Sequence, residues 1–366
     1  MRILYAIQGT GNGHTCRGQE ILHVLKKRHD VDILVSGTHV EIGLPYEIAY
    51  QFKGLGFIFG KSGGIDLLAT YKKNRIRRLL SEINQLPVED YDLVISDFEP
   101  VSAWACQQKR KPCIALSHQA AVLNRNSPKP AKPGGLGRAI LKRYAPATAR
   151  YGFHFQPYDD NIFTPIIRQQ VRDQIVRNDG HYTVYLPAYG NDRILKVLRQ
   201  CQSIKWEVFS KHSKEEIHDG NISIFPVSNE AFLESMATSS GILCGAGFET
   251  PAEALYMGKK LLVIPMKDQY EQQCNAAALA EMGVPVLKSL KLKHLPFIHD
   301  WILQGEVVQV YYPDHTEEIL HKIISENTGE NISGRTPKAQ AVSSAKRFRT
   351  AIIRHIASNY SVGSKH

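Results

Sequence analysis

The sequence predicts an α/β protein built from two tandem doubly wound, Rossmann-like domains that face each other across a cleft. Three observations lead to this prediction. Short runs rich in β-branched residues alternate with helix-like stretches, as they do in a parallel sheet with crossover helices. The alternation comes in two series, separated by a polar stretch with two prolines at 156–180. The length of 366 residues also suits two domains of ordinary size.

The first series predicts an N-terminal domain over residues 1–160. It opens with an apolar run that leads into a glycine-rich turn, and further apolar runs then alternate with helix-like stretches. The predicted strands are Ile3–Ile7, Val31–Val35, Asp92–Ser96, Pro112–Leu116 and Phe153–Phe155, and the predicted helices include Thr15–Arg28 and Trp104–Lys109.

The second series predicts a C-terminal domain over residues 181–328, joined to the first by a linker at 161–180. Its predicted strands are Tyr182–Leu186, Trp206–Phe209, Ile222–Phe225, Gly241–Cys244 and Leu261–Ile264. We expect 329–366 to be a basic tail whose final helix, at 339–357, packs on the N-terminal domain or stays free.

The composition is that of a folded protein, with 43% hydrophobic and 22% charged residues. No run approaches the roughly 18 apolar residues that a membrane helix needs. The first residues lack the length and cleavage site of a signal peptide. The six cysteines are scattered without a C-x-x-C pair, which indicates reduced thiols. We therefore expect a cytoplasmic protein.

The net charge of +10 is concentrated in two segments. Residues 125–150 hold seven Lys or Arg and no acid, and 329–366 hold seven against Glu330 alone. Such a concentration favours an anionic partner, either an acidic membrane surface or a phosphorylated substrate, although a solvated basic surface explains it equally well. A nucleic acid is not expected, because the basic segments lack interleaved aromatic residues and match no binding pattern.

The glycine-rich turn Gly9-Thr-Gly-Asn-Gly-His14 does not fit a dinucleotide site. His14 stands where that fingerprint has its third glycine, and the second strand ends without an acid for the ribose. No Gly-Lys-Ser/Thr follows, so the Walker pattern fails as well. His14 in this turn is interpreted either as a general base at the cleft or as a histidine satisfied by local backbone.

A second residue favours the base. Asp97 follows the buried run of "LVISDFEP" and should lie at the same edge of the sheet as His14. Its carboxylate could accept from one imidazole nitrogen and leave the other free to take a proton. Glu99 could compete for this role, and Asp97 could also cap the helix that follows.

The most informative stretch of the second half is "GILCGAGFETPAEALYMGKKLLVIPMKDQYEQQCNA". Small residues at Gly245 and Gly247 let backbone N–H groups and a helix N-terminus face an anion such as a diphosphate. Glu253, in the first turns of that helix, is suited to two vicinal ribose hydroxyls. After Pro265 come side chains that can hydrogen-bond sugar hydroxyls, namely Asp268, Gln269, Glu271, Gln272 and Asn275.

With these motifs the sequence resembles the GT-B glycosyltransferases, in the branch of the UDP-glycosyltransferases and the bacterial lipid-linked GlcNAc transferase of peptidoglycan synthesis. The resemblance covers about residues 1–325 and is specific at "GTGNGH", "CGAGFETPAEALYMGKK" and "PMKDQYEQQCNA". It implies that the N-terminal domain takes the acceptor and the C-terminal domain takes the nucleotide sugar.

The resemblance also assigns roles to individual residues. His14 corresponds to the family's base, Asp97 to its orienting acid and Glu253 to its ribose ligand. The diphosphate falls on the glycine loops and the helix start, at Gly11, Gly13, Gly245, Gly247, Phe248, Glu249 and Thr250. The nucleobase falls at Phe225–Val227. The sugar-binding acid–glutamine pair is Glu271-Gln272, preferred for its Q-x-x-N spacing, or Asp268-Gln269.

Two positions depart from the family pattern. Many relatives carry a histidine or arginine for the diphosphate where this chain has Gly245, and Glu249 places an acid in the phosphate loop. Phosphate binding must therefore use backbone donors or another side chain, and Glu249 must point away or cap the helix.

The resemblance implies a single displacement with inversion at the anomeric carbon, with no metal and no cofactor besides the nucleotide sugar, a UDP-sugar by family weight. The Asp-x-Asp triplet Asp30-Val-Asp32 opens the second strand at the far end of the sheet, away from the expected site. The expected acceptor is a hydroxyl of a lipid-linked or cell-envelope molecule, reached by peripheral contact of 125–150 with an anionic membrane.

The alternative functions are a sugar-nucleotide epimerase on the same fold and a non-catalytic nucleotide-sugar-binding protein.

Overall fold

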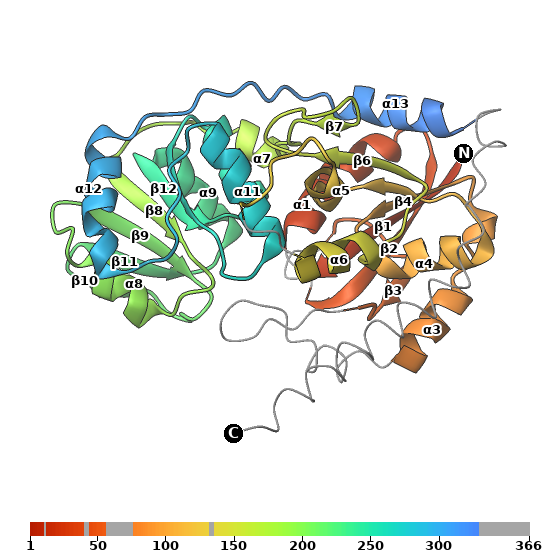
Figure 1. Cartoon of the computed structure of the whole chain (residues 1–366), viewed down its shortest axis with the longest axis horizontal. Coiled ribbons are helices and arrows are strands. Elements are labelled where there is room, and N and C mark those ends of the chain that lie inside the picture. Colours follow the sequence, from red (N-terminus) through yellow and green to blue (C-terminus); the bar gives the residue numbers. More distant parts are fainter. Residues whose placement is uncertain (11, 40–43, 56–75, 132–134, 329–366) are drawn as a thin grey trace.

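The computed structural model describes residues 1–10, 12–39, 44–55, 76–131 and 135–328, and these residues form two α/β halves side by side (Figure 1). Each half is built on one sheet with helices packed around it. The predicted pair of doubly wound domains is confirmed.

The N-terminal half holds a seven-stranded parallel sheet in the order β3-β2-β1-β4-β5-β6-β7. The strands are β1 (Arg2–Thr10), β2 (Asp30–His39), β3 (Tyr50–Phe52), β4 (Leu93–Asp97), β5 (Ile114–Leu116), β6 (Ala149–Phe153) and β7 (Ile162–Phe163). The helices are α1 (Asn12–Leu25), α3 (Ile76–Gln85), α4 (Pro100–Lys109), α5 (His118–Leu123), α6 (Gly135–Tyr144) and the short α7 (Gln169–Arg172), which belongs to the segment leading to the second half.

The C-terminal half holds a six-stranded sheet in the order β10-β11-β9-β8-β12-β13, in which only β10 is antiparallel to its neighbour. The strands are β8 (His181–Tyr185), β9 (Lys205–Ser210), β10 (Ile217–Asp219), β11 (Ile222–Pro226), β12 (Gly241–Gly245) and β13 (Lys260–Ile264). The helices are α8 (Asn191–Leu198), α9 (Asn229–Thr238), α10 (Glu249–Tyr256), α11 (Tyr270–Glu281), α12 (Leu295–Gln304) and α13 (Thr316–Asn327).

The predicted strand at Phe153–Phe155 is shifted along the chain. The strand is β6, and it ends at Phe153. Phe155 belongs to the segment after the strand and is buried because its ring packs against Phe248 of the other half, with centroids 5.3 Å apart. Its apolar character therefore reflects contact between the halves and not membership of a strand.

Helix α13 lies over the N-terminal half, although the sequence analysis placed residues up to 328 in the second domain (Figure 1). It packs against α1, and Tyr151 of β6 donates a 2.6 Å hydrogen bond to Glu326. Asn327 in turn donates to the Tyr151 hydroxyl at 2.9 Å. The chain thus returns to the first half before the tail, and the helix predicted at 339–357 lies outside the described residues.

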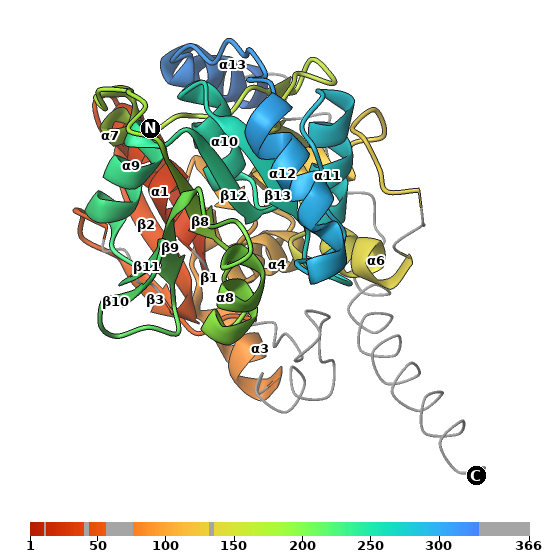
Figure 2. The ribbon, with the colours of Figure 1, turned by 90° about the vertical axis from the view of Figure 1, so that its left-hand side faces the viewer.

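The two halves also meet where α6 packs against α11 (Figure 2). Gly137 of α6 lies so close to Tyr270 that a Cβ added to the glycine would be 2.7 Å from the tyrosine Cβ. Leu141 of α6 joins a small apolar cluster with Val122, Tyr270 and Cys274. Nowhere in the described part of the chain is there a helix with the length and apolar character needed to cross a bilayer.

A substitution at Gly152 of β6 tests how tightly the N-terminal half is packed. A Cβ at this position would lie 2.5 Å from the backbone nitrogen of Ala121 and 2.8 Å from the carbonyl oxygen of Ser117. We expect Gly152→Ala to lower the free energy of unfolding by roughly 1–3 kcal/mol in denaturant titrations, because backbone atoms of α5 must shift. Gly247→Ala is the control, since its Cβ would meet no atom within 4 Å. Equal effects of the two substitutions would contradict this packing.

Candidate active site

The candidate site lies where the two halves meet, at the carboxyl ends of β1 and β4. These strands are neighbours in the sheet, but the chain leaves β1 toward β2 on one side and β4 toward β5 on the other. Ligands of open α/β sheets bind at such a switch point. A cavity of about 280 Å³ is found here, and it is lined by residues of both halves.

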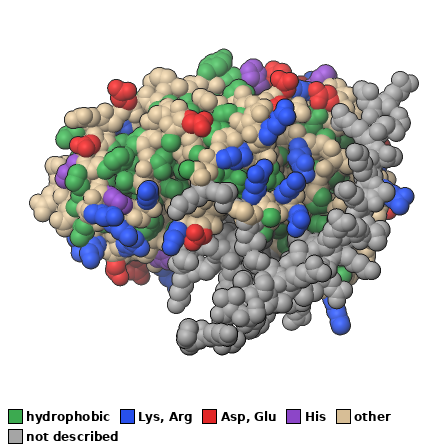
Figure 3. Space-filling view, viewed as in Figure 1, with side chains coloured by type: hydrophobic (Ala, Val, Ile, Leu, Met, Phe, Trp, Pro, Cys, Tyr) green, Lys and Arg blue, Asp and Glu red, His purple; other side chains and the backbone are tan. Residues whose placement is uncertain are grey.

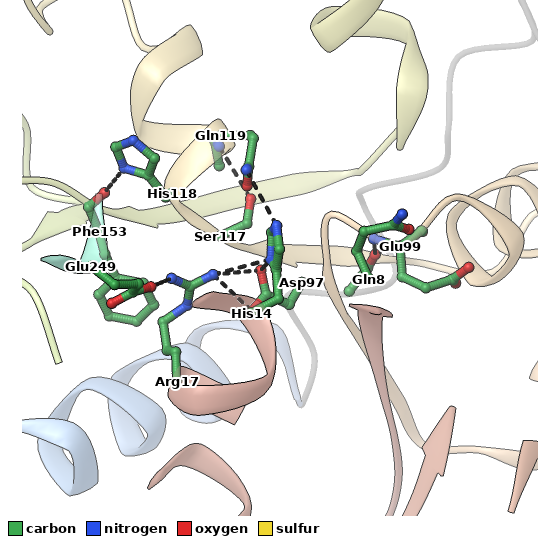
Figure 4. Close-up of polar contacts among 12 residues, drawn as sticks. Gln8, His14, Arg17, Asp97, Glu99, Ser117, His118, Gln119, Phe153 and Glu249 are labelled. Carbon is green, nitrogen blue, oxygen red and sulfur yellow. Dashed lines mark hydrogen bonds and ion pairs between the residues drawn. The ribbon is translucent and has the colours of Figure 1, made fainter. Parts of the chain in front are cut away.

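His14 and Asp97 form a hydrogen-bonded pair at this point (Figure 4). Asp97 ends β4, level with Ile7 of β1, and His14 lies in the first turn of the helix after β1. The distance from His14 Nδ1 to Asp97 Oδ1 is 2.8 Å. A carboxylate accepts only, so Nδ1 donates and Nε2 is left as an acceptor. His14 lines the cavity, and its Nε2 lies 3.4 Å from Gln119 Nε2.

Glu99 takes the capping role that sequence reasoning had left open. Its carboxylate accepts from the backbone N–H groups of Val101 and Ser102 at 2.7 and 2.6 Å, at the start of α4. Asp97 is therefore not the helix cap, and Glu99 does not orient His14. The two acids differ because Asp97 is the last residue of the strand, whereas Glu99 stands directly before the helix.

Arg17 is the principal residue that the sequence analysis missed. It is one helical turn beyond His14 in α1, and its side chain is only 2% exposed. Its Nη2 donates to both carboxylate oxygens of Asp97, each at 2.8 Å, and its Nη1 donates to Oε1 of Glu249 in the other half. Burial opposes its charge, yet these two acids keep the pKa of Arg17 above its ordinary value. The i, i+3 spacing from His14 is the signal that could have found it.

The charge on Asp97 is maintained by its partners. The carboxylate is fully buried, and burial by itself would raise its pKa. Arg17 and His14 outweigh this effect, so that the pKa of Asp97 lies below its ordinary value. Asp97 is therefore an anion that can orient His14 and stabilise an imidazolium.

Glu249 is the first residue of α10 and points toward the N-terminal half (Figure 4). Burial raises its pKa to about 7, although Arg17 acts in the opposite direction. Gly13 allows this approach, because a Cβ there would be 2.9 Å from Glu249 Cγ. The sequence analysis expected Glu249 either to point away from the phosphate loop or to cap its helix. In the structure its carboxylate instead forms an ion pair with Arg17 of the other half.

Two residues of α5 make further contacts between the halves. The His118 ring stacks on Phe248, with centroids 3.9 Å apart and an interplanar angle of 8°. Its Nε2 lies 2.8 Å from Oδ1 of Asn275, whose amide also donates to Ala246 at 3.1 Å. Gln119 donates to Glu271 at 3.1 Å. The sequence had not singled out His118 or Gln119, because only the fold brings α5 to the cleft.

The two candidate sugar-binding pairs are placed differently. Asp268, Gln269 and Glu271 line the cavity. Gln272 does not, because its Oε1 accepts from the backbone nitrogen of Met266 at 2.8 Å. Asp268 has a backbone φ of 67°, in the left-handed region.

The Glu253 carboxylate is engaged by Arg168, from the segment that joins the halves. Arg168 Nε and Nη2 donate to the two oxygens of Glu253 at 2.6 and 3.0 Å, and Glu253 is 4% exposed. Arg168 Nη1 also donates to Asn229 at 2.9 Å. No motif or spacing in the sequence indicated this pairing.

The remaining predicted residues lie around the C-terminal sheet. Phe225 stacks on Phe209, with centroids 5.5 Å apart, and lines a separate groove beside β9, β11 and α9. Val227 is 38% exposed, and neither Phe225 nor Val227 lines the cavity. Gly245 ends β12, Gly247 lies in the β12–α10 connection, and Thr250 lies in the first turn of α10. Gly11 lies outside the described residues. The described residues include no group of three or more His, Cys, Asp or Glu side chains placed to hold a metal ion.

Comparison with known proteins identifies the family. The sequence profile of glycosyl transferase family 1 matches residues 1–299. The chain belongs to this family. The predicted glycosyltransferase, with the GT-B architecture, is thereby confirmed. No curated protein sequence matches that of this glycosyltransferase.

Solved structures share its fold at low identity. MurG of Acinetobacter baumannii is 14% identical with a TM-score of 0.55, and the match covers 88% of this chain and 99% of that chain. A UDP-glucosyltransferase of Polygonum tinctorium, in complex with 3,4-dichloroaniline, is 14% identical with a TM-score of 0.55 and coverages of 96% and 98%. CalG4, the calicheamicin glycosyltransferase, is 13% identical with a TM-score of 0.55 and coverages of 95% and 98%.

Replacing Asp97 by asparagine tests the buried ion pair of the glycosyltransferase. The variant keeps the side-chain shape but leaves Arg17 buried without the charge of its bidentate partner. We expect the free energy of unfolding to fall by about 3–5 kcal/mol in urea titrations at neutral pH. Asp32→Asn is the matched control: Asp32 pairs with Arg2, both side chains are partly exposed, and its unfolding midpoint should stay close to that of the wild type.

The pH dependence follows from the same pair. The pKa of Asp97 is lowered in the folded state. Its contribution to the free energy of unfolding is therefore fully present above the ordinary pKa of aspartate, and it is lost as the pH falls through the lower, folded-state pKa. The Asn variant lacks this contribution at every pH. If the difference in free energy of unfolding between wild type and Asp97→Asn does not become smaller at acid pH, the lowered pKa of Asp97 is contradicted.

Proposed function

We propose that this glycosyltransferase moves a sugar from a nucleoside diphosphate sugar, a UDP-sugar, to a hydroxyl acceptor, with inversion at the anomeric carbon and without a metal ion or further cofactor. The observation that carries the proposal is the hydrogen bond between His14 and Asp97. It leaves Nε2 of His14 as the proton acceptor, and His14 lines the cavity between the halves. The name of the similar Polygonum tinctorium enzyme, a UDP-glucosyltransferase, supports the choice of UDP.

In the proposed reaction, His14 Nε2 takes the proton of the acceptor hydroxyl as its oxygen attacks the anomeric carbon. The bond from that carbon to the diphosphate oxygen breaks, and its electron pair leaves with the nucleoside diphosphate. Asp97 holds the ring and stabilises the imidazolium. Positioned base catalysis of this kind contributes roughly 10²–10⁴-fold.

The donor would lie along the C-terminal half. The start of α10 offers unpaired backbone N–H groups to the diphosphate, and the space beside Gly247 is open. Asp268, Gln269 and Glu271 line the cavity where the sugar would bind. Glu253 remains the proposed ribose ligand, and this role requires it to exchange Arg168 for ribose hydroxyls.

The basic face of α6 supports an acceptor at an anionic membrane surface. Among the residues of 125–150 that the structure describes, the exposed cations are Arg125, Arg138, Lys142, Arg143 and Arg150. Lys and Arg side chains gather on this face of the molecule (Figure 3). Ile140, Leu141 and Tyr144 of the same helix line the cavity. We therefore propose a peripheral, cytoplasmic enzyme that takes a lipid-linked or cell-envelope acceptor beside α6.

The function is tested by separating donor binding from transfer. Purified protein is screened by thermal shift with nucleotide sugars, and the donor that binds is then offered with candidate acceptors. A ligand at about 100 times its Kd adds about 2.7 kcal/mol of stability. We expect His14→Asn to keep this shift and to lose roughly 10²–10⁴-fold in kcat.

The matched control is His23→Asn, the same substitution at an exposed position of α1 that does not line the cavity. Its kcat should equal that of the wild type. If no nucleotide sugar shifts the wild type, or if His14→Asn transfers sugar at the full rate, the proposed function is wrong.

The membrane contact is tested by sedimentation with vesicles rich in phosphatidylglycerol. Arg138→Glu together with Lys142→Glu should weaken binding by at least about 30-fold, since each basic residue near an anionic surface contributes about 1 kcal/mol. A control with the same net charge is Lys196→Glu together with Lys293→Glu, both exposed on the C-terminal half. Equal losses in both double variants would show that only net charge matters, and no binding by the wild type would remove the membrane from the proposal.

A further inference from the structure

The cavity has few positive charges for a ligand that must carry two negative ones. Among the described residues that line it, Arg17 is the one arginine or lysine, whereas Glu249, Asp268 and Glu271 are acids. The connection from Gly245 to Thr250 holds no Lys, Arg or His. A diphosphate bound at the start of α10 would therefore contact one arginine among the described residues of the cavity lining, and that arginine comes from the N-terminal half.

The two arms of Arg17 are engaged unequally. Nη2 binds both oxygens of Asp97, which is fully buried. Nη1 binds one oxygen of Glu249, whose side chain is 21% exposed. Nε is buried and has no hydrogen-bond partner in the described part of the chain. The Asp97 contact is thus bidentate and enclosed, and the Glu249 contact is the one that a ligand can replace.

Glu249 also occupies a place that favours an anion. It is the first residue of α10, where backbone N–H groups lack helical partners, and its side chain packs against Gly13 in the first turn of α1. Both helix N-termini carry partial positive charge. The carboxylate is therefore at the junction of two helix starts and in contact with the only cation of the cavity lining that the structure describes.

We propose that Arg17 is the cation that binds the diphosphate of the donor, and that Glu249 binds its Nη1 before the donor does, in the place that a phosphate oxygen then takes. On donor binding, Nη1 exchanges the Glu249 carboxylate for phosphate, while Nη2 stays on Asp97. The inference rests on the proposed function and deepens it, because it assigns a donor ligand to the acceptor half. It also accounts for the lack of a basic residue at Gly245.

The exchange makes donor affinity depend on pH. A neutral Glu249 releases Nη1 readily, whereas an ionised Glu249 competes with the phosphate for Arg17 and repels it. Burial raises the pKa of Glu249 to about 7, so this competition arises near neutral pH. Among the described residues, the charged and titratable groups that face Glu249 are Tyr5 of β1, His14, Cys16 and Arg17 of α1, Asp97 of β4, Glu253 of α10, and Arg168.

The test measures dissociation constants by calorimetry for UDP-glucose, GDP-mannose and dTDP-glucose with the full chain. The phosphates of these sugars are esterified and do not titrate near neutral pH. For the tightest ligand, we expect the wild-type Kd to rise about tenfold between about pH 6 and about pH 8, as the neutral fraction of Glu249 falls. Glu249→Gln should have a flat profile and bind about tenfold more tightly than the wild type at about pH 8.

Two controls separate this role from a merely structural ion pair. The nucleoside that matches the ligand lacks phosphates, so its affinity should be the same in wild type and Glu249→Gln. Arg17→Lys keeps a positive charge beside Asp97 but loses the forked donors of the guanidinium group. This variant should bind the nucleotide sugar more weakly than the wild type and bind the nucleoside with unchanged affinity. If that variant does not fold, the Gln variant still decides the matter.

The outcomes distinguish the two proposals. If the wild type binds a nucleotide sugar but Glu249→Gln binds no more tightly, or if the pH dependence persists in that variant, the role of Arg17 is overturned and the proposed function stands. If none of the three nucleotide sugars binds the wild type, both proposals are overturned.

Discussion

The charge of Arg17 is the constraint on which the arrangement of the site depends. A guanidinium that is 2% exposed must be neutralised inside the protein, and its two acids come from different halves of the chain. Asp97 ends β4 of the first sheet, and Glu249 begins α10 after a strand of the second. Holding one buried charge therefore fixes the edge of one sheet against the helix start of the other.

Close approach of the halves is possible because small residues stand at the contacts. Gly13 admits the side chain of Glu249, and Gly137 admits Tyr270, where a Cβ would in each case lie under 3.0 Å from a side-chain atom. The stacked rings of His118 and Phe248 then close the space behind them. The same contacts that join the halves also shape the cavity, so substitutions here change stability and ligand binding together.

Neighbouring carboxylates in this chain have separate functions because their backbone positions differ. Asp97 ends a buried strand and faces His14, while Glu99, two residues later, binds the first N–H groups of α4. Glu249 and Glu253 are one turn apart on α10, yet they pair with Arg17 and Arg168, from different segments of the first half and the linker. In each pair the residue type alone could not have separated the functions.

The sequence by itself determined the two α/β domains, the family, and the pairing of His14 with Asp97. The domains follow from local periodicity, and the pairing of His14 with Asp97 follows from the rule that carboxyl ends of parallel strands share one edge. The family follows from the resemblance carried by the glycine-rich turn and by the motifs of the second half. Only the tertiary structure decided the partners of Arg17, Glu249 and Glu253 and the return of α13 to the first half. Those depend on how two separately patterned halves pack together, and contacts between residues far apart in the chain leave no periodic signal in the sequence.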